Sequence, residues 1–182
     1  TQNGVRGGNA TTHFPFWHYE IEDILVLKNN KGTEDNRVRR LDYSIQLNKV
    51  MYERLLNDQE ISLFSPHDVP ELYDSFYADQ EKFQELYEKY ERKTSIKKKK
   101  IKAMELFSAL IKERAETGRI YIMNVDHANT HSSFKDPVYM SNLCQEITLP
   151  TKPLQHIDDP DGEIALCILS AINVGTIKLE EL

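Results

Sequence analysis

The sequence has few cysteines and no long apolar run, and both absences narrow its class. Among 182 residues there are only two cysteines, Cys144 and Cys167. Two cysteines cannot form the disulfide framework typical of small secreted domains, so a reducing cytosol is the expected location. Neither belongs to a Cys-x-x-Cys pair, which excludes a thioredoxin motif and a zinc ribbon. No stretch approaches the roughly 20 apolar residues of a membrane span, and we predict no membrane partner.

An excess of basic charge is also absent, since the formal net charge is −6. Surfaces that bind a nucleic-acid duplex neutralise its phosphates with a basic face, so we predict no nucleic-acid partner. A nucleotide substrate is not excluded, because it needs only a local site. The chain starts at Thr1 without an initiator Met or an apolar leader, and it stops at Leu182 without a closing element. We therefore expect a piece of a longer chain.

Strand and helix patterns alternate along the chain. Apolar and polar residues alternate over 42–47, which predicts a strand, and helical spacing follows over 49–56. The apolar run 163–174 is typical of a strand buried on both faces of a parallel sheet. The other expected elements are a short helix at 21–27 and extended segments at 14–19, 61–64, 119–125 and 143–149. This alternation predicts an α/β architecture, either an open sheet or a closed barrel.

Two longer segments have the periodicity of amphipathic helices. The apolar face of the first comprises Phe83, Leu86, Tyr87 and Tyr90. That of the second comprises Ala103, Leu106, Phe107, Leu110 and Ile111. Gly118 stands where a glycine ends a helix. Between the two segments, the four lysines 97–100 are either a phosphate-binding patch or a solvated helix start or linker.

The strongest candidate for chemistry is the hexapeptide Ser141-Asn142-Leu143-Cys144-Gln145-Glu146. Side chains of an extended chain alternate between two faces, so Asn142, Cys144 and Glu146 would share one face, each ~7 Å from the next. An amide, a thiol and a carboxylate would then converge on one small substrate. The thiol could act as a nucleophile or a hydrogen-atom donor, and the carboxylate as a general base. The alternative is that Cys144 is a buried packing residue and Glu146 is merely exposed.

Other reactive side chains have weaker patterns. Cys167 lies in an apolar run and, by itself, fits a small core residue better than a redox group. His127 and His131 could hold a metal if they lay on a helix, but their polar neighbours indicate a loop and no third ligand has a suitable spacing. We therefore predict no metal site. A hydrolase that uses Cys144 with His127, His131 or His156 is a further alternative, although no spacing supports it.

Several stretches, in a common order, resemble the large (alpha) catalytic subunit of class I ribonucleotide reductases. The motif Asn142-x-Cys144-x-Glu146, followed by Cys167, is the most specific of them. The matching stretches are 4–8, 25–30, 63–66 with 68–70, 117–122, 124–127 with 129–131, 141–147, 149–154 and 162–167. The resemblance extends over essentially the whole chain. It implies that residues 1–182 are a partial catalytic barrel domain, part of the family's ten-stranded α/β barrel, with a finger loop that carries the radical cysteine.

The resemblance also implies a role for each candidate residue. Cys144 matches the cysteine that becomes a thiyl radical and takes the ribose 3′ hydrogen atom. Glu146 matches the carboxylate that accepts the proton of the 3′ hydroxyl, and Asn142 matches the amide that hydrogen-bonds the ribose. Cys167 matches one member of the redox-active pair that reduces the substrate as the 2′ hydroxyl leaves as water; its partner is absent from this sequence. The implied activity is ribonucleoside-diphosphate reduction for DNA synthesis in the cytoplasm.

Partners and cofactors are implied by the same resemblance. The expected partners are a ribonucleoside diphosphate substrate, a small radical-generating (beta) subunit that contains the metal, thioredoxin or glutaredoxin, and a second copy of the full large subunit. No cofactor is expected on this chain, and allosteric nucleotides would bind outside it. We expect the chain alone to be inactive. A non-catalytic interaction or folding fragment, such as one piece of a split gene, is the alternative from a different functional class.

Overall fold

The computed structural model describes residues 4–5, 7–176, 178 and 180. Arg6, which belongs to the stretch 4–8 noted above, lies outside the described residues. The chain divides into two compact units, Thr1–Pro150 and Thr151–Leu182. Every helix and strand named below lies in the first unit. That residues 1–182 form one partial barrel domain stays a prediction.

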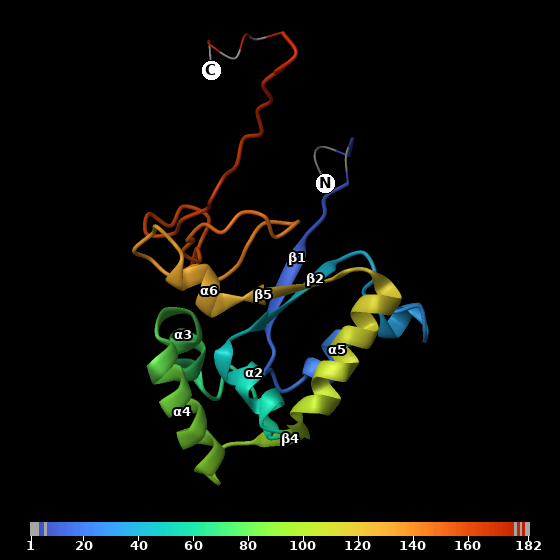
Figure 1. The fold of residues 1–182 in the computed structure, drawn as a ribbon, viewed down its shortest axis with the longest axis vertical. Coiled ribbons are helices and arrows are strands. Elements are labelled where there is room, and N and C mark those ends of the chain that lie inside the picture. Colours follow the sequence, from blue (N-terminus) through green and yellow to red (C-terminus); the bar gives the residue numbers. More distant parts are fainter. Residues whose placement is uncertain (1–3, 6, 177, 179, 181–182) are drawn as a thin grey trace. The chain divides into compact units, whose positions relative to one another are not determined.

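A three-stranded parallel sheet forms the centre of the first unit, in the order β1-β2-β5 (Figure 1). The strands are β1 (Thr11–Pro15), β2 (Asp42–Leu47) and β5 (Ile120–Asn124). In the central strand, Ser44 is paired with His13 on one side and Tyr121 on the other. Parallel neighbours need crossover connections. The first crossover contains α1 (Ile21–Leu25) and the 3₁₀ turn η1 (Glu34–Asn36).

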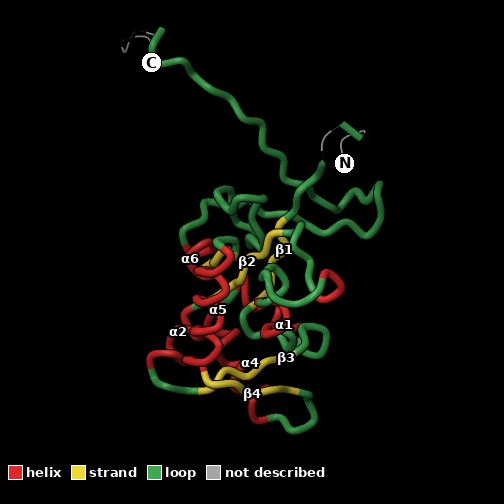
Figure 2. The backbone as a smooth tube through the Cα atoms, turned by 90° about the vertical axis from the view of Figure 1, so that its right-hand side faces the viewer, coloured by secondary structure: helices red, strands yellow, loops and turns green. Residues whose placement is uncertain are grey.

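The second crossover carries most of the helices and a separate antiparallel strand pair, β3 with β4 (Figure 2). Its elements are α2 (Lys49–Leu56), β3 (Glu60–Phe64), α3 (Pro70–Ala78), α4 (Gln80–Arg92), β4 (Lys98–Lys102) and α5 (Ala103–Thr117), and α6 (Val125–Thr130) follows β5. Asn48 begins α2 by accepting a hydrogen bond from the backbone of Met51. Gly118 ends α5 with a φ of +65°, as the sequence predicted.

The central sheet has one apolar and one polar face. Along β2, Tyr43, Ile45 and Leu47 point to one side and Asp42, Ser44 and Gln46 to the other, because strand side chains alternate. The apolar three belong to the hydrophobic core. Ser44 and Gln46 are fully buried although they are polar. Buried polar side chains are normally hydrogen-bonded, so this face needs polar partners.

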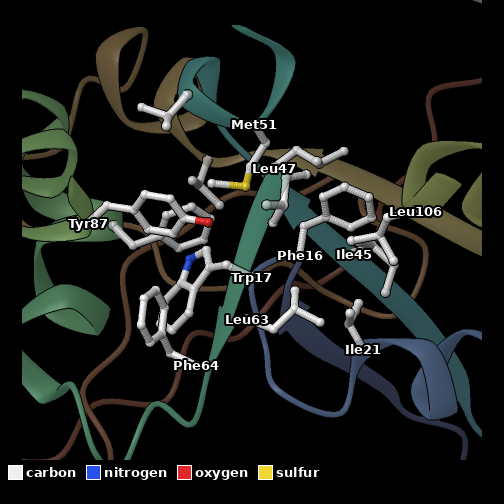
Figure 3. Close-up of a cluster of buried hydrophobic side chains, with 14 of the residues drawn as sticks. Phe16, Trp17, Ile21, Ile45, Leu47, Met51, Leu63, Phe64, Tyr87 and Leu106 are labelled. Carbon is white, nitrogen blue, oxygen red and sulfur yellow. The ribbon is translucent and has the colours of Figure 1, made fainter. Parts of the chain in front are cut away.

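The hydrophobic core lies between the sheet and the helices and is rich in aromatic rings. Figure 3 shows Phe16 and Ile45 beside Leu106 of α5, and Trp17 beside Phe64 and Tyr87. All of the residues labelled there are fully buried or nearly so. The rings of Phe16 and Phe107 are 4.7 Å apart in an edge-on arrangement. This packing fixes β1 and β2 from the apolar side and leaves their polar side free to carry a site.

Several sequence predictions are confirmed, and others are wrong in location or type. The segment 14–19, expected as a short strand or a strand end, contains the end of β1 at Pro15, and the next two residues turn into the core. The lysines 97–100 are not a helix start or linker, because Lys98–Lys102 form β4. Lys99 and Lys100 form ion pairs with Glu22 and Glu60, and charged side chains on an edge strand disfavour pairing with another chain.

The apolar run 163–174 is the largest departure. None of its residues is in a strand longer than a single bridge, which joins Glu163 to Lys152, and all of them are exposed. Ile168, for example, is 94% exposed. The apolar composition predicted that this run is buried. No described residue covers it.

None of the helices in the described part of the chain has the length and apolar character needed to span a membrane.

Candidate active site

The candidate hexapeptide forms a tight turn rather than an extended strip. The backbone N–H of Gln145 donates to the carbonyl of Asn142 at 3.1 Å. The side-chain oxygen of Asn142 accepts from the backbone N–H of Ile147, also at 3.1 Å. Gln145 has a positive φ of 64°, which reverses the chain after Cys144. The turn closes on itself because residue types with short polar side chains, Ser141 and Asn142, satisfy its backbone groups.

Strand β1 holds the first limb of this turn. The hydroxyl of Thr11 donates to the carbonyl of Leu143 at 2.7 Å. His13, two residues further on the same face of β1, contacts the carbonyl of Ser141 through Nε2 at 3.2 Å. A carbonyl can only accept, so Nε2 of His13 carries the proton. Two alternate side chains of β1 therefore bind two alternate carbonyls of the turn.

Strands β2 and β5 hold the second limb through one side chain. Ser44 of β2 donates to Oε1 of Gln145 at 2.5 Å. Nε2 of Gln145 donates in turn to the carbonyl of Ile122 in β5 at 2.7 Å. A further bond ties the preceding segment down, because Gln46 donates to the carbonyl of Tyr139 at 2.6 Å. The polar face of the sheet thus obtains most of its partners from residues 139–145, and the side-chain oxygen of Gln46 accepts from the hydroxyl of Tyr77 in α3.

The environment of His13 keeps its ring neutral. Burial lowers its pKa below the ordinary value of 6.5, and the hydrogen bond to Ser141 opposes this only in part. Nδ1 of the same ring is buried and has no hydrogen-bond partner among the described residues. A proton at Nδ1 would be a buried donor without an acceptor, which is unfavourable. The ring therefore acts as a neutral donor toward the turn.

Three of the predicted site residues lie in this turn, but they do not share one face. Cys144 and Glu146 are exposed, whereas the alternating neighbours Leu143 and Gln145 are half-buried. Asn142 is half-buried, and its amide oxygen points back into the turn. The prediction of one extended strip is therefore wrong, because the chain turns between Asn142 and Gln145, with a positive φ at Gln145, and Asn142 does not share the exposed side of Cys144 and Glu146. Cys144 is also not the buried packing residue of the alternative interpretation.

Cys167, the fourth predicted residue, belongs to the second unit. It is exposed and lies in the segment 164–171, which forms no backbone hydrogen bond within the described part of the chain. The interpretation as a small core residue does not describe it here. Its redox role stays a prediction.

The histidine alternatives gain no support from the geometry. His127 lies in α6, so the expected loop is wrong there, and its ring is 5.9 Å from that of His131. Among the described residues no group of three or more His, Cys, Asp or Glu side chains could hold a metal. No described histidine is hydrogen-bonded to Cys144. The one histidine that contacts the turn, His13, binds the carbonyl of Ser141 instead.

Sequence reasoning missed the residues that position the turn. The sequence motif singled out Cys144 and Glu146 but gave no role to Gln145 between them, nor to Thr11 or His13. A signal was present in 42–47, where polar residues alternate with apolar ones and so place Ser44 and Gln46 on one face of the strand.

Comparison with known proteins identifies the family of the chain. Residues 1–181 match the family model described as ribonucleotide reductase, barrel domain. The chain is 64% identical over 181 residues to the ribonucleoside-diphosphate reductase subunit alpha of Haemophilus influenzae, covering 98% of this chain and 24% of that protein.

Two further relatives have the same kind of name. The Escherichia coli ribonucleoside-diphosphate reductase 1 subunit alpha is 62% identical over 157 residues, which cover 85% of this chain and 21% of the relative. The alpha subunit of Enterobacteria phage T4 is 50% identical over 175 residues, covering 94% and 23%. The chain thus spans about a quarter of the length of the relatives it matches. It belongs to the ribonucleotide reductase barrel-domain family.

Proposed function

We propose that this chain is part of the catalytic large subunit of a ribonucleoside-diphosphate reductase, and that the turn at Cys144 presents the radical thiol to the ribose. The observation that carries the proposal is that some residues of the turn hold it in place while others are exposed. Asn142 and Gln145 hold it by hydrogen bonds, whereas Cys144 and Glu146 are left exposed on it. A thiol and a carboxylate are then available to one substrate.

The first stage of the proposed reaction uses Cys144 and Glu146. As a thiyl radical, Cys144 takes the hydrogen atom from C3′ of the ribose, which forms an S–H bond and leaves a carbon radical. Glu146 accepts the proton of the 3′ hydroxyl as a general base. Removing that proton makes loss of the neighbouring 2′ hydroxyl easier. Asn142 would orient the ribose through Nδ2, which donates to no group among the described residues.

The second stage uses Cys167 and a second thiol. The C2′–O bond breaks and the 2′ hydroxyl leaves as water with one proton from this pair, while the second proton and the two electrons of the pair go to the sugar, where a new C2′–H bond forms, and the pair becomes a disulfide. Cys144 then returns its hydrogen atom to C3′, and Glu146 returns the proton. The net change is one ribonucleoside diphosphate and two thiols to one deoxyribonucleoside diphosphate, one disulfide and one water.

The remaining partners follow from the proposed activity. A small beta subunit carries the metal centre that supplies the oxidising equivalent for the Cys144 radical. Thioredoxin or glutaredoxin reduces the disulfide, two large subunits associate, and allosteric nucleotides bind elsewhere on the subunit. The finger loop of a ten-stranded α/β barrel is the setting proposed for the Cys144 turn, because a thiyl radical needs protection from water. The cytoplasm is the proposed location.

The test is to replace Cys144 with Ser in the complete large subunit, assayed with its small subunit and a dithiol reductant. We expect deoxynucleotide formation to be abolished while substrate binding is retained. Cys167→Ser is the matched control, because it makes the same replacement of sulfur by oxygen at the other cysteine. It should block turnover with dithiol reductants and also leave substrate binding nearly unchanged. Deoxynucleotide formation by Cys144→Ser would refute the proposal, and lost substrate binding in Cys167→Ser would assign that residue a structural role.

A further inference from the structure

We propose that Gln145 is a positioning residue, whose side chain fixes the Cys144 turn on the sheet by joining Ser44 of β2 to Ile122 of β5. The catalytic consequence rests on the function proposed above, but the positioning itself does not.

The two hydrogen bonds of Gln145 use both ends of one amide. Oε1 accepts from the hydroxyl of Ser44 and Nε2 donates to the carbonyl of Ile122. Ser44 is fully buried. Losing the partner of a buried hydroxyl costs about 1–3 kcal/mol. A primary amide meets both requirements at once, whereas a carboxylate can only accept and an alkyl group can do neither.

Among the described residues, the second limb of the turn has no other hydrogen bond to the sheet. In the part of the chain that the structure describes, every hydrogen bond from residues 144–147 to the sheet comes from Gln145. The bonds of Ile147 stay within the turn, since they run to Asn142 and Ser141. Thr11 and His13 hold only the first limb. Without Gln145, the second limb would be released from the sheet, and the hydrogen bonds within the turn would open more often.

The backbone conformation of Gln145 also directs its side chain toward the sheet. Its positive φ of 64° is uncommon for a residue other than glycine. Here the side chain is half-buried, while Cys144 before it and Glu146 after it are exposed. The unfavourable conformation is compensated by the two side-chain hydrogen bonds. The residue that anchors the turn is therefore directly bonded to both reactive residues.

The expected consequence is a loss of rate with little loss of binding. A displacement of about 1 Å in a reacting group can lower the rate by about 100-fold. We therefore expect Gln145→Leu to lower kcat by roughly 10- to 100-fold and to change KM by less than about twofold. Gln145→Glu retains the acceptor for Ser44 and loses the donor for Ile122, so its kcat should lie between those of the parent and the Leu variant.

The experiment uses the complete large subunit with its small subunit. Hydrogen exchange of the backbone amides at positions 145 and 147 is measured together with kcat and KM for a ribonucleoside diphosphate. In Gln145→Leu these two amides should exchange about tenfold faster, because the turn opens more often. Amides of β3, which lies in the other sheet, should keep their rates. Gln155→Leu is the matched control, since Gln155 is exposed and its side chain forms no hydrogen bond in the described structure.

Ser44→Ala is the second variant, because it removes one of the two bonds without changing the residue at positive φ. It should accelerate the same amides by a smaller factor, and the double variant with Gln145→Leu should be no faster than Gln145→Leu alone. Unchanged exchange and unchanged kcat in both single variants would overturn the proposal. So would a raised KM with constant kcat, which would make Gln145 a substrate contact. If the parent enzyme reduces no ribonucleotide, the function proposed above fails, and the exchange rates still decide the role of Gln145.

Discussion

The two cysteines of this chain lie in segments of opposite construction. Cys144 lies in a turn whose polar side chains bind its own backbone and strands β2 and β5, and whose backbone accepts a hydrogen bond from Thr11 of β1. Cys167 lies in an apolar segment that is exposed and forms no backbone hydrogen bond over 164–171 within the described residues. The first segment is held by hydrogen bonds within itself and to the sheet. The second has residue types that are stable only when other elements cover them.

This difference shows how a reactive loop is held without burying its reactive groups. In the Cys144 turn, anchoring and chemistry are assigned to alternating residues, with Gln145 directed to the sheet and Cys144 and Glu146 exposed. Substitutions at anchoring positions should therefore change the mobility of the turn. Substitutions at exposed positions should change the chemistry alone. The predictions below test this separation and extend it to the second segment.

The largest expected effect is at Glu146. In the complete subunit, Glu146→Gln should lower kcat by about 10²- to 10⁴-fold, the usual contribution of a general base. Because Glu146 is exposed and has no hydrogen bond in the described structure, thermal stability and amide exchange in the turn should not change. Glu146→Asp, which keeps the carboxylate, should retain more activity. A stability loss in Glu146→Gln would show that the anchoring and reactive positions are not separate.

The next effect is at Asn142, which closes the turn. Asn142→Ala removes the acceptor for the backbone of Ile147, so local opening of the turn should become easier by about 1–3 kcal/mol. Hydrogen exchange of the Ile147 amide measures it. Asn173→Ala is the matched change in the second unit, where the side chain accepts from Gly175 in an exposed turn. Its effect should stay within about 0.5 kcal/mol, and equal effects at the two sites would contradict the comparison.

A smaller effect concerns pH and His13. Burial lowers the pKa of His13 below 6.5, so between that lowered pKa and 6.5 the unfolded chain binds more protons than the folded one. The stability from its neutral ring is therefore complete above pH 6.5 and is lost as pH falls through the lowered pKa. His13→Gln keeps a donor for Ser141 and does not titrate. Denaturation midpoints should fall less steeply for His13→Gln than for the parent below pH 6.5, and parallel curves would argue against the buried neutral ring.

The smallest effect is expected in the second unit. Ile168 is 94% exposed, so Ile168→Gln in this chain should change the free energy of unfolding by less than about 0.5 kcal/mol. Chemical denaturation measures this. A loss of several kcal/mol would show that another element covers the segment, and the contrast between the two cysteine segments would then disappear.

Local patterns in the sequence predicted much of the fold. The strand 42–47 and the helix 49–56 were predicted from their periodicity with the bounds that the structure has. The end of α5 at Gly118 was predicted because glycine readily adopts the left-handed backbone conformation that ends many helices. These features depend on neighbours within one turn of helix or two residues of strand, so the sequence of each segment is sufficient to specify them.

The site was predicted less well, because its geometry depends on residues that are distant in sequence. Cys144 and Glu146 were identified by motif, but the turn that holds them depends on a bond between Gln145 and Ser44, 101 residues away. No periodicity encodes that pair. In the run 163–174, composition indicated burial without naming the partner that would provide it. The helix at His127 was missed because the polar residues that follow it are also typical of loops.

The most direct test of the account follows the hydrogen atom at C3′ of the ribose. With a substrate deuterated at C3′, the complete enzyme should turn over more slowly than with the ordinary substrate, because Cys144 breaks that bond. Cys144→Ser should neither form deoxynucleotide nor exchange any C3′ label with solvent, whereas Cys167→Ser should retain some exchange. Label exchange that persists in Cys144→Ser and vanishes in Cys167→Ser would contradict the account, because it would assign the hydrogen abstraction to the other cysteine.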